Sequence, residues 1–144
     1  MHVAHILNSK GHDVVSVGET TTIAEVCQTL RDNAIGSVVV TGIYGTLAGV
    51  ISERDIAHGV AAYGAGFVDM TAAQIVTRRV LTCAPESSVD ELMHKMTDQH
   101  VRHMPVIDRE SLTGIVSIGD VVRWRLDELQ GEAQGLREYV TRTW

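Results

Sequence analysis

The sequence predicts an α+β protein made of two tandem β-α-β-β-α repeats, packed with pseudo-twofold symmetry and followed by an extended C-terminal helix. Three observations lead to this prediction. A segment of about 65 residues occurs twice in the chain. In each copy, apolar residues at helical spacing alternate with short β-branched runs. After the second copy, a stripe of apolar residues continues at coiled-coil spacing.

The repeat is clearest where GVISERDI (residues 49–56) returns as GIVSIGDV (residues 114–121), a shift of 65. Further upstream, TIAEVCQTL matches SVDELMHKM at a shift of 66, and IGSVVV matches VRHMPV at the same shift. One residue is therefore lost in a turn, and loops absorb such changes at little cost. Two copies of this length indicate a duplicated small domain, because solenoid arrays have shorter periods and more copies.

The first copy contains the elements strand, helix, strand, strand and helix in that order. Residues 14–17 (VVSV) are typical of a strand. Thr22 and Glu25 have the spacing of a capping box that begins a helix, and apolar residues follow at i, i+3, i+4 and i+7. SVVVT (37–41) and LAGVIS (47–52) predict paired strands, and ERDIAHGVAAY predicts the last helix.

The second copy repeats this order. VLT (80–82) predicts its first strand, Ser88 and Glu91 its capping box, and MPVID and LTGIVS its paired strands. Met93 and Met96 lie on the apolar stripe of the helix, so we interpret them as packing residues. One copy alone cannot cover its small sheet, so we expect the two copies to pack together as one unit.

We divide the chain at the following boundaries: residues 1–69, the first repeat with its N-terminal segment; 70–79, a linker helix; 80–128, the second repeat; and 129–144, the C-terminal helix extension.

The C-terminal stripe has the spacing of a coiled-coil seam. Its members follow one another in steps of 4, 3, 4, 3 and 4: Val122, Leu126, Leu129, Ala133, Leu136 and Val140. Gly131 and Gly135 weaken the helix that carries it. The seam must be buried against the protein's own core or against another chain, and the sequence leaves both possibilities open.

Composition excludes several classes of protein. With 44% hydrophobic and 21% charged residues, the chain resembles an ordinary globular protein, and it contains no apolar run of membrane-spanning length. The segment MHVAHILNSKGHD lacks the features of a secretory signal, so we expect a cytoplasmic location. Cys27 and Cys83 lie far apart, which favours free thiols. A net charge of −6 disfavours nucleic-acid binding, so any anionic ligand needs a local site.

GVISERDI, RHMPVID and GIVSIGDV, with the linker IVTRRV, resemble a tandem pair of cystathionine β-synthase (CBS) domains, a Bateman module. The resemblance spans essentially the whole chain and implies a stand-alone regulatory module that is not an enzyme and requires no cofactor. It implies that an adenine nucleotide, such as AMP, ADP, ATP or a dinucleotide like NAD, binds in clefts between the copies. It also implies disc-like homodimers, with an unidentified regulated protein as a further partner.

The resemblance assigns the ribose to two signatures, residues 52–55 and 117–120. The aspartates, Asp55 and Asp120, would contact the ribose hydroxyls, and the serines, Ser52 and Ser117, would lie close to ribose or phosphate. Ile118 and Gly119, between Ser117 and Asp120, are further candidates. At a predicted strand-to-helix junction, free N–H groups and the helix dipole favour an anion. The same spacing is typical of helix capping, and the two roles are compatible because a carboxylate has several acceptor positions.

The resemblance also assigns residues to the phosphate and the adenine. The candidates for the phosphate are Arg54, Arg102 and His103, with Met104 and Pro105 on the same strand and Gly36 and Ser37 at the matching places of the first copy. The candidates for backbone contacts to adenine are Val14, Val15, Val80 and Thr82.

The two clefts are predicted to be unequal. Gly36 and Ser37 replace Arg102 and His103 in the first copy, and Gly119 replaces an arginine in the second. If the central strand of one copy lies beside the other copy's signature, the basic residues converge near the first signature and that cleft holds the more phosphorylated ligand. The same strand could instead line the cleft of its own copy.

Other chemistry has less support. The histidines at 94, 100 and 103 fit neither HExxH nor a zinc-finger spacing, so no metal site is expected. Motifs for nucleophilic catalysis are absent from the sequence, and the two aspartates belong to separate copies. Three function classes remain: a nucleotide-sensing module, a structural dimerisation module with vestigial clefts, and, with least support, an enzyme acting on a nucleotide.

Overall fold

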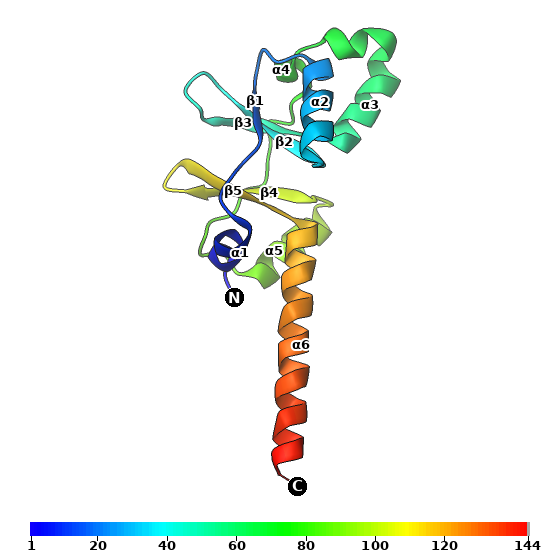
Figure 1. Ribbon diagram of the computed structural model, residues 1–144. Coiled ribbons are helices and arrows are strands. Elements are labelled where there is room, and N and C mark those ends of the chain that lie inside the picture. Colours follow the sequence, from blue (N-terminus) through cyan, green and yellow to red (C-terminus); the bar gives the residue numbers. More distant parts are fainter. Residues whose placement is uncertain (144) are drawn as a thin grey trace.

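The computed structural model describes residues 1–143 and shows two stacked halves, with one long helix projecting from the lower half (Figure 1). Its elements, in chain order, are α1 (Val3–Lys10), β1 (Ser16–Gly18), α2 (Ile23–Asn33), β2 (Ser37–Thr41), β3 (Leu47–Ser52), α3 (Glu53–Tyr63), the 3-10 helix η1 (Gly64–Asp69), α4 (Ala72–Ile75), α5 (Val89–Asp98), β4 (His103–Asp108), β5 (Ser111–Ser117) and α6 (Ile118–Arg142). The predicted α+β class, the repeat and the C-terminal helix are confirmed.

The first half is a three-stranded sheet covered by α2 and α3. β1 is parallel to β2, and β2 is antiparallel to β3. The predicted capping box at the start of α2 is present, since Glu25 N donates to Thr22 Oγ1 and Thr22 N donates to the Glu25 carboxylate. Val26, Val38 and Ile51 are fully buried between helix and sheet.

The second half has two strands instead of the predicted three. β4 pairs with β5, and a single bridge between Cys83 and Val106 stands where the third strand was expected. The prediction of a strand at residues 80–82 is therefore wrong. Beyond Cys83 the chain turns away, because Ala84 N donates to Ser87 Oγ and Pro85 has no N–H for a ladder.

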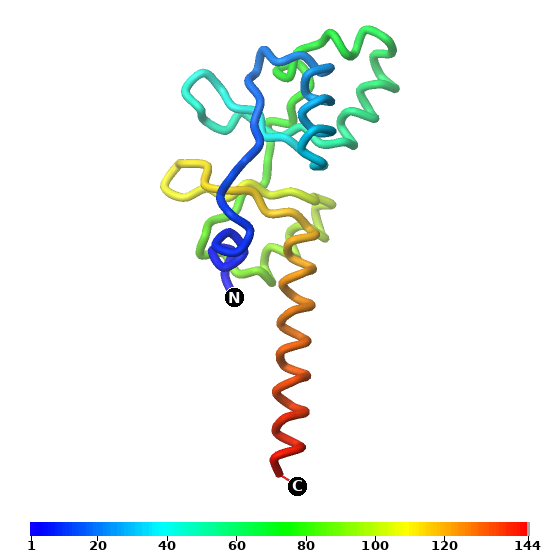
Figure 2. Tube along the Cα trace, in the orientation of Figure 1, coloured from blue at the N-terminus to red at the C-terminus, as the bar shows by residue number. Residues whose placement is uncertain are grey.

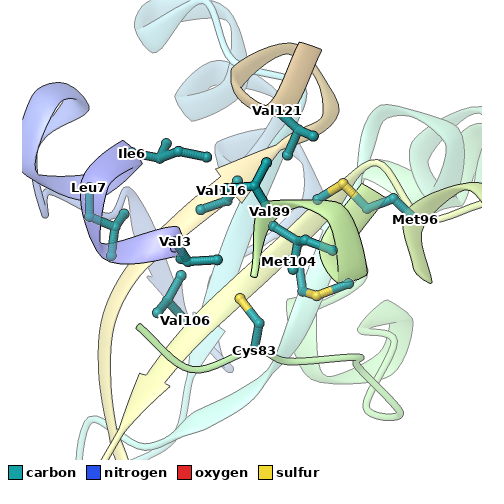
Figure 3. Packing of buried hydrophobic residues seen from close by; sticks show 11 residues of the cluster. Val3, Ile6, Leu7, Cys83, Val89, Met96, Met104, Val106, Val116 and Val121 are labelled. Atoms are coloured by element: carbon teal, nitrogen blue, oxygen red, sulfur yellow. The ribbon is translucent and has the colours of Figure 1, made fainter. Parts of the chain in front are cut away.

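The core of the second half contains residues from both ends of the sequence. Figure 3 shows Val3, Ile6 and Leu7 of α1 packed with Met104 and Val116 of the β4–β5 sheet, among other side chains. Met96 also lies here, which confirms its packing role. Both cysteines are free; burial raises the pKa of Cys83 to about 11, so the thiol stays protonated.

Each repeat is preceded by a short helix that crosses to the other half. α1 precedes the first repeat but packs on the second, where Val3 N donates to Ser87 O at 2.9 Å. α4 precedes the second repeat but packs on the first, where Ala72 N donates to Thr21 O at 2.7 Å. The tube in Figure 2 shows the first crossing, in blue, passing from the lower half to the upper. The segment grouped by sequence with residues 1–69 thus belongs in space to both halves.

The repeated signature glycines make room for these crossing segments. A Cβ atom at Gly49 would lie 2.3 Å from Thr77 O, in the linker that follows α4. A Cβ atom at Gly114 would lie 2.7 Å from Leu7 Cδ2, on α1. Both glycines are therefore required by close approach of another segment to the sheet.

α6 runs for 25 residues and leaves the body of the protein part-way along its length. Val121 is buried and Trp124 packs against the second core, whereas every residue from Leu129 to Arg142 is exposed. The residues of the predicted seam are exposed, so the seam is not buried within this chain. No helix among residues 1–143 combines the length and apolarity needed to cross a membrane.

Candidate functional site

A cavity of about 640 Å³ lies between the two halves. Its walls are the β3–α3 junction, the β5–α6 junction, the start of β4 and the linker over residues 77–81. Its volume is in the ordinary range for small-ligand sites, about 300–1,000 Å³. Both copies therefore contribute to one cavity that is open to solvent on one side.

The first signature opens into this cavity and caps α3. Asp55 N donates to Ser52 Oγ at 3.3 Å, and Asp55 Oδ2 accepts a hydrogen bond from Ser52 N at 2.8 Å. The expected capping geometry is therefore present. The other carboxylate oxygen of Asp55 has no hydrogen-bond partner within residues 1–143, which leaves an acceptor for a ligand hydroxyl.

The second signature makes the same cap but is already paired with a cation. Lys10 Nζ lies 2.5 Å from Asp120 Oδ2 and also donates to Ile115 O at 2.9 Å. Burial alone would raise the pKa of the Asp120 carboxyl, but the bonds from Lys10 and Ser117 outweigh it and hold that pKa below its ordinary value. Asp120 is not part of the cavity wall, although Ser117 is.

Three arginines surround the first signature: Arg54, Arg79 and Arg102. None of them forms an ion pair with the part of the chain that the structure describes. They outnumber the two carboxylates in the wall, Glu53 and Asp55. In a chain of net charge −6, this cavity is a local positive site.

The ring of His103 lies against Gly36 of the first copy, where the absence of a side chain leaves room for it. Its ring lies 3.5 Å from where a Cβ atom of Gly36 would be. Burial, and then the nearby charges of Lys10 and Arg102, hold the pKa of His103 below its ordinary value, against the opposing effect of Asp120 and Glu53. The ring is therefore neutral at pH 7 and can donate only one hydrogen bond.

Ten of the predicted ligand residues line the cavity: Gly36, Ser52, Arg54, Asp55, Val80, Arg102, His103, Ser117, Ile118 and Gly119. Seven do not: Val14, Val15, Ser37, Thr82, Met104, Pro105 and Asp120. Met104 is fully buried in the second core and Ser37 is 6% exposed, so neither side chain reaches the cavity. Of the two arrangements left open, the structure brings Arg102 and His103 into the cavity of Asp55.

Sequence reasoning missed seven lining residues: Val50, Glu53, Thr77, Arg79, Leu81, His100 and Val101. Arg79 matters most because it adds a third guanidinium. It reaches the cavity because Thr77 and Val50 exchange backbone hydrogen bonds at 3.2 Å, which ties the linker to β3. The linker IVTRRV resembles linkers of the family, but the sequence did not show which of its two arginines lines the cavity.

A family model for the CBS domain matches the chain twice, at residues 3–62 and 72–127. The chain belongs to the CBS domain family. The two matches confirm a tandem CBS pair, and the cavity lies between its two members.

Similar proteins are found among curated relatives and solved structures. CBSX3, a mitochondrial CBS domain-containing protein of Arabidopsis thaliana, is 34% identical over 123 residues. The match covers 83% of this CBS pair but only 60% of CBSX3, so the chain spans about three fifths of that relative. A CBS-domain containing protein from Agrobacterium tumefaciens is 41% identical with a TM-score of 0.84, and the match covers 86% of this chain and 92% of that one.

Two further solved structures contain adenosine compounds. A CBS domain protein of Pyrobaculum aerophilum, solved with AMP, is 30% identical with a TM-score of 0.74 and coverage of 83% and 89% of the two chains. Another CBS domain pair, solved with 5′-methylthioadenosine and S-adenosyl-L-methionine, is 26% identical with a TM-score of 0.79 and coverage of 89% and 98%.

Proposed function

We propose that this CBS pair is a regulatory module that binds an adenine nucleotide in the cavity between its halves, without catalysis. The observation that carries the proposal is the convergence of the first signature with three arginines in one cavity. Related CBS proteins bound to AMP, or to methylthioadenosine and S-adenosylmethionine, support an adenosine ligand. Because both halves line the cavity, a bound ligand shifts their relative arrangement, which an unidentified regulated protein detects.

In this proposal the ribose and the phosphate have separate partners. The unpartnered oxygen of Asp55 accepts hydrogen bonds from the ribose hydroxyls, and the α3 N-terminus beside it favours negative charge. Arg102 and Arg79 face the phosphate, since guanidinium groups bind phosphate with two parallel hydrogen bonds. No further cofactor is required, and we place the module in the cytoplasm.

The proposal also assigns one nucleotide to each chain. Asp55 offers a free acceptor to the cavity, whereas Asp120 lies outside it and is neutralised by Lys10. The second signature therefore lacks the charge that a ribose diol would contact. A purely structural dimerisation module is the second candidate, because the exposed seam of α6 favours it.

Calorimetry on wild type and four variants tests the proposal. Asp55→Asn keeps the cap but loses charge-assisted bonds, so affinity for both AMP and adenosine should fall about 10- to 100-fold. Arg102→Ala should weaken AMP far more than adenosine, most clearly at low salt. Asp120→Asn should have little effect, and Asp127→Asn on exposed α6 serves as the control.

The outcomes separate the candidate functions. No heat and no rise in melting temperature with any adenine nucleotide would favour the structural module. Unchanged affinity in a folded Asp55→Asn variant would overturn the ribose assignment, and equal loss of AMP and adenosine in Arg102→Ala would overturn the phosphate role. Two identical sites per chain would contradict the inequality. Chemical change of the nucleotide after incubation, followed by chromatography, would identify an enzyme.

A further inference from the structure

His103 lies close to the N-termini of both α3 and α6. Its ring faces Gly36, whose carbonyl oxygen accepts a hydrogen bond from the N–H of Glu53, the first residue of α3, at 2.9 Å. The carbonyl oxygen of Arg102, the residue before His103, accepts the N–H of Ile118, the first residue of α6, at 2.8 Å. Because the N-terminus is the positive end of a helix dipole, this position favours a bound anion and disfavours a cationic side chain.

The ring of His103 is free to contact a ligand. It forms no hydrogen bond within residues 1–143, and neither ring nitrogen is among the fully buried polar atoms that lack a partner. A Cβ atom at Gly36 would lie 3.5 Å from Cε1 of the ring and 3.7 Å from the carboxyl carbon of Glu53, so these two side chains meet at one place in the cavity wall. A ligand phosphate that reaches the N-terminus of α3 therefore lies beside the imidazole.

The charges that face His103 come from every segment packed around it. Lys10 of α1 and Arg102, just before β4, oppose a positive charge on the ring, whereas Asp120 of α6 and Glu53 of α3 favour one. Burial is the largest effect, and together these influences lower the pKa of His103 from its ordinary value of 6.5. The ring is therefore neutral at pH 7 while the cavity is empty.

A bound phosphate reverses this balance, because it brings negative charge to the ring. Arg54, Arg79 and Arg102 are charged at every physiological pH. Among the wall residues that the structure describes, only the imidazoles of His100 and His103 can gain a positive charge near neutral pH. His100 is exposed, so water and salt screen its charge, whereas His103 is half-buried and interacts more strongly with the phosphate.

We propose that binding of a phosphorylated adenosine ligand in the cavity is coupled to uptake of a proton by His103. This inference rests on the proposed function and adds a regulating variable, the pH, to it. The neutral ring donates one hydrogen bond, whereas the imidazolium donates from both nitrogens and adds a cation to the three arginines. His103 thereby distinguishes phosphorylated from unphosphorylated adenosine, and does so more strongly at lower pH.

The direction of the pH effect follows from linkage. The phosphate raises the pKa of His103 above its value in the empty cavity, which is itself below the ordinary 6.5. Affinity for the ligand is therefore highest below the pKa of the empty state. It falls as the pH rises towards the pKa of the bound state and becomes constant above that value.

Calorimetry with the methyl ester of AMP at pH 6.0 and 8.0 tests the coupling. The ester keeps one phosphate charge over this range, whereas the phosphate of AMP itself gains a proton near pH 6. The ester should bind roughly three- to tenfold more tightly at pH 6.0. At pH 7, the binding heat in buffers of different protonation enthalpy should show net proton uptake. Adenosine should bind with neither effect.

Three histidine variants locate the proton. His103→Gln keeps one hydrogen-bond donor and should lose both the pH dependence and the proton uptake, with affinity near that of wild type at pH 8.0. His94→Gln, at an exposed position of α5, should keep the wild-type pH dependence. If His100→Gln loses the pH dependence while His103→Gln retains it, the proton binds to the other imidazole and the proposal is wrong.

NMR of wild type gives a test that requires no variant to fold. The Cε1–H signal of His103, assigned through the backbone, should titrate with a midpoint that moves to higher pH when the methyl ester of AMP is bound. Adenosine should leave the midpoint in place. An unmoved midpoint with the ester bound would overturn this inference and leave the proposed function standing, whereas absence of any binding would overturn both.

Discussion

At the scale of single residues, an ion pair with Lys10 makes Asp120 different from Asp55, although the two aspartates hold equivalent positions in the repeat. Asp55 and Asp120 occupy the same place in the repeat and make the same cap, but only Asp120 is bonded to a lysine. Lys10 lies outside both signatures and reaches Asp120 from the end of α1. No spacing rule links the two residues, because they are 110 positions apart.

Lys10→Met should remove stability that depends on the charge of Asp120. The folded-state pKa of Asp120 is depressed, so its contribution is present above the unfolded pKa of about 4 and is lost as the pH falls through the folded value. We expect the variant to be about 1 kcal/mol less stable at pH 7 in urea unfolding, with the difference vanishing in acid. Lys95→Met, at an exposed position of α5, is the control. A difference that persists at pH 2 would show that lost packing, not charge, is responsible.

His103→Gln should change how the stability of the protein depends on pH between pH 7.5 and 5.5. The folded pKa of His103 is lowered, chiefly by burial, so its contribution is present above about pH 6.5 and is lost as the pH falls below that value. Wild type should lose melting temperature between pH 7.5 and 5.5, and the variant should lose less. The same substitution at exposed His94 should leave the wild-type slope intact. Identical slopes in wild type and His103→Gln would contradict the assignment.

At the scale of elements, the two signature glycines have different neighbours despite their equivalent positions. Gly49 faces the backbone of Thr77, which cannot move without breaking its bond to Val50, whereas Gly114 faces the end of the Leu7 side chain. The β3–linker contact is therefore less adaptable than the β5–α1 contact.

We expect Gly49→Ala to destabilise the protein by about 3 kcal/mol and Gly114→Ala by about 1 kcal/mol, because a side chain can change rotamer and a bonded carbonyl cannot. Urea unfolding of both variants measures the difference. Gly66→Ala, where a Cβ atom would meet nothing within 4 Å, is the control. Equal losses at the two signature glycines would show that Leu7 is as rigid as the linker.

The elements themselves were predictable where the local sequence decides them. The helix that begins after Thr22 carries both its cap and its apolar stripe in the sequence, and it forms as expected. The strand predicted at residues 80–82 carried a β-branched pattern but no information on pairing. Residues 80–82 do not pair because the chain there runs along the cavity, with Val80 and Leu81 in its wall. Pairing with β4 is limited to Cys83, after which the turn at Ala84 and Pro85 ends it.

At the scale of the whole molecule, the crossed leading helices couple the two halves. α1 completes the second core, and α4 with η1 completes the first, so neither half buries its apolar residues without the other half's leading segment. We therefore expect the two bodies on either side of the cavity to unfold together.

Ile6→Ala should therefore weaken both halves. Ile6 is 1% exposed in the second core, and truncation of such a side chain costs about 2–5 kcal/mol. Hydrogen exchange read by mass spectrometry should show β2–β3 and β4–β5 losing protection by the same amount. Ile43→Ala, at a residue that is 93% exposed, should change neither sheet. Loss of protection confined to β4–β5 would show that the halves unfold separately.

The amino-acid sequence by itself determined the duplicated architecture, the caps, the heptad seam and most of the residues that line the cavity. Those features depend on neighbours within a few residues or on the repeat, and both are visible in the amino-acid sequence. The tertiary structure alone decided that Lys10 neutralises one signature, that Arg79 joins the other, and that α1 crosses to the second half. Each of these depends on segments that are far apart in the sequence and meet only after folding. The contacts that hold these segments are backbone hydrogen bonds and apolar packing, which many different sequences can form, so no residue pattern identifies them in advance.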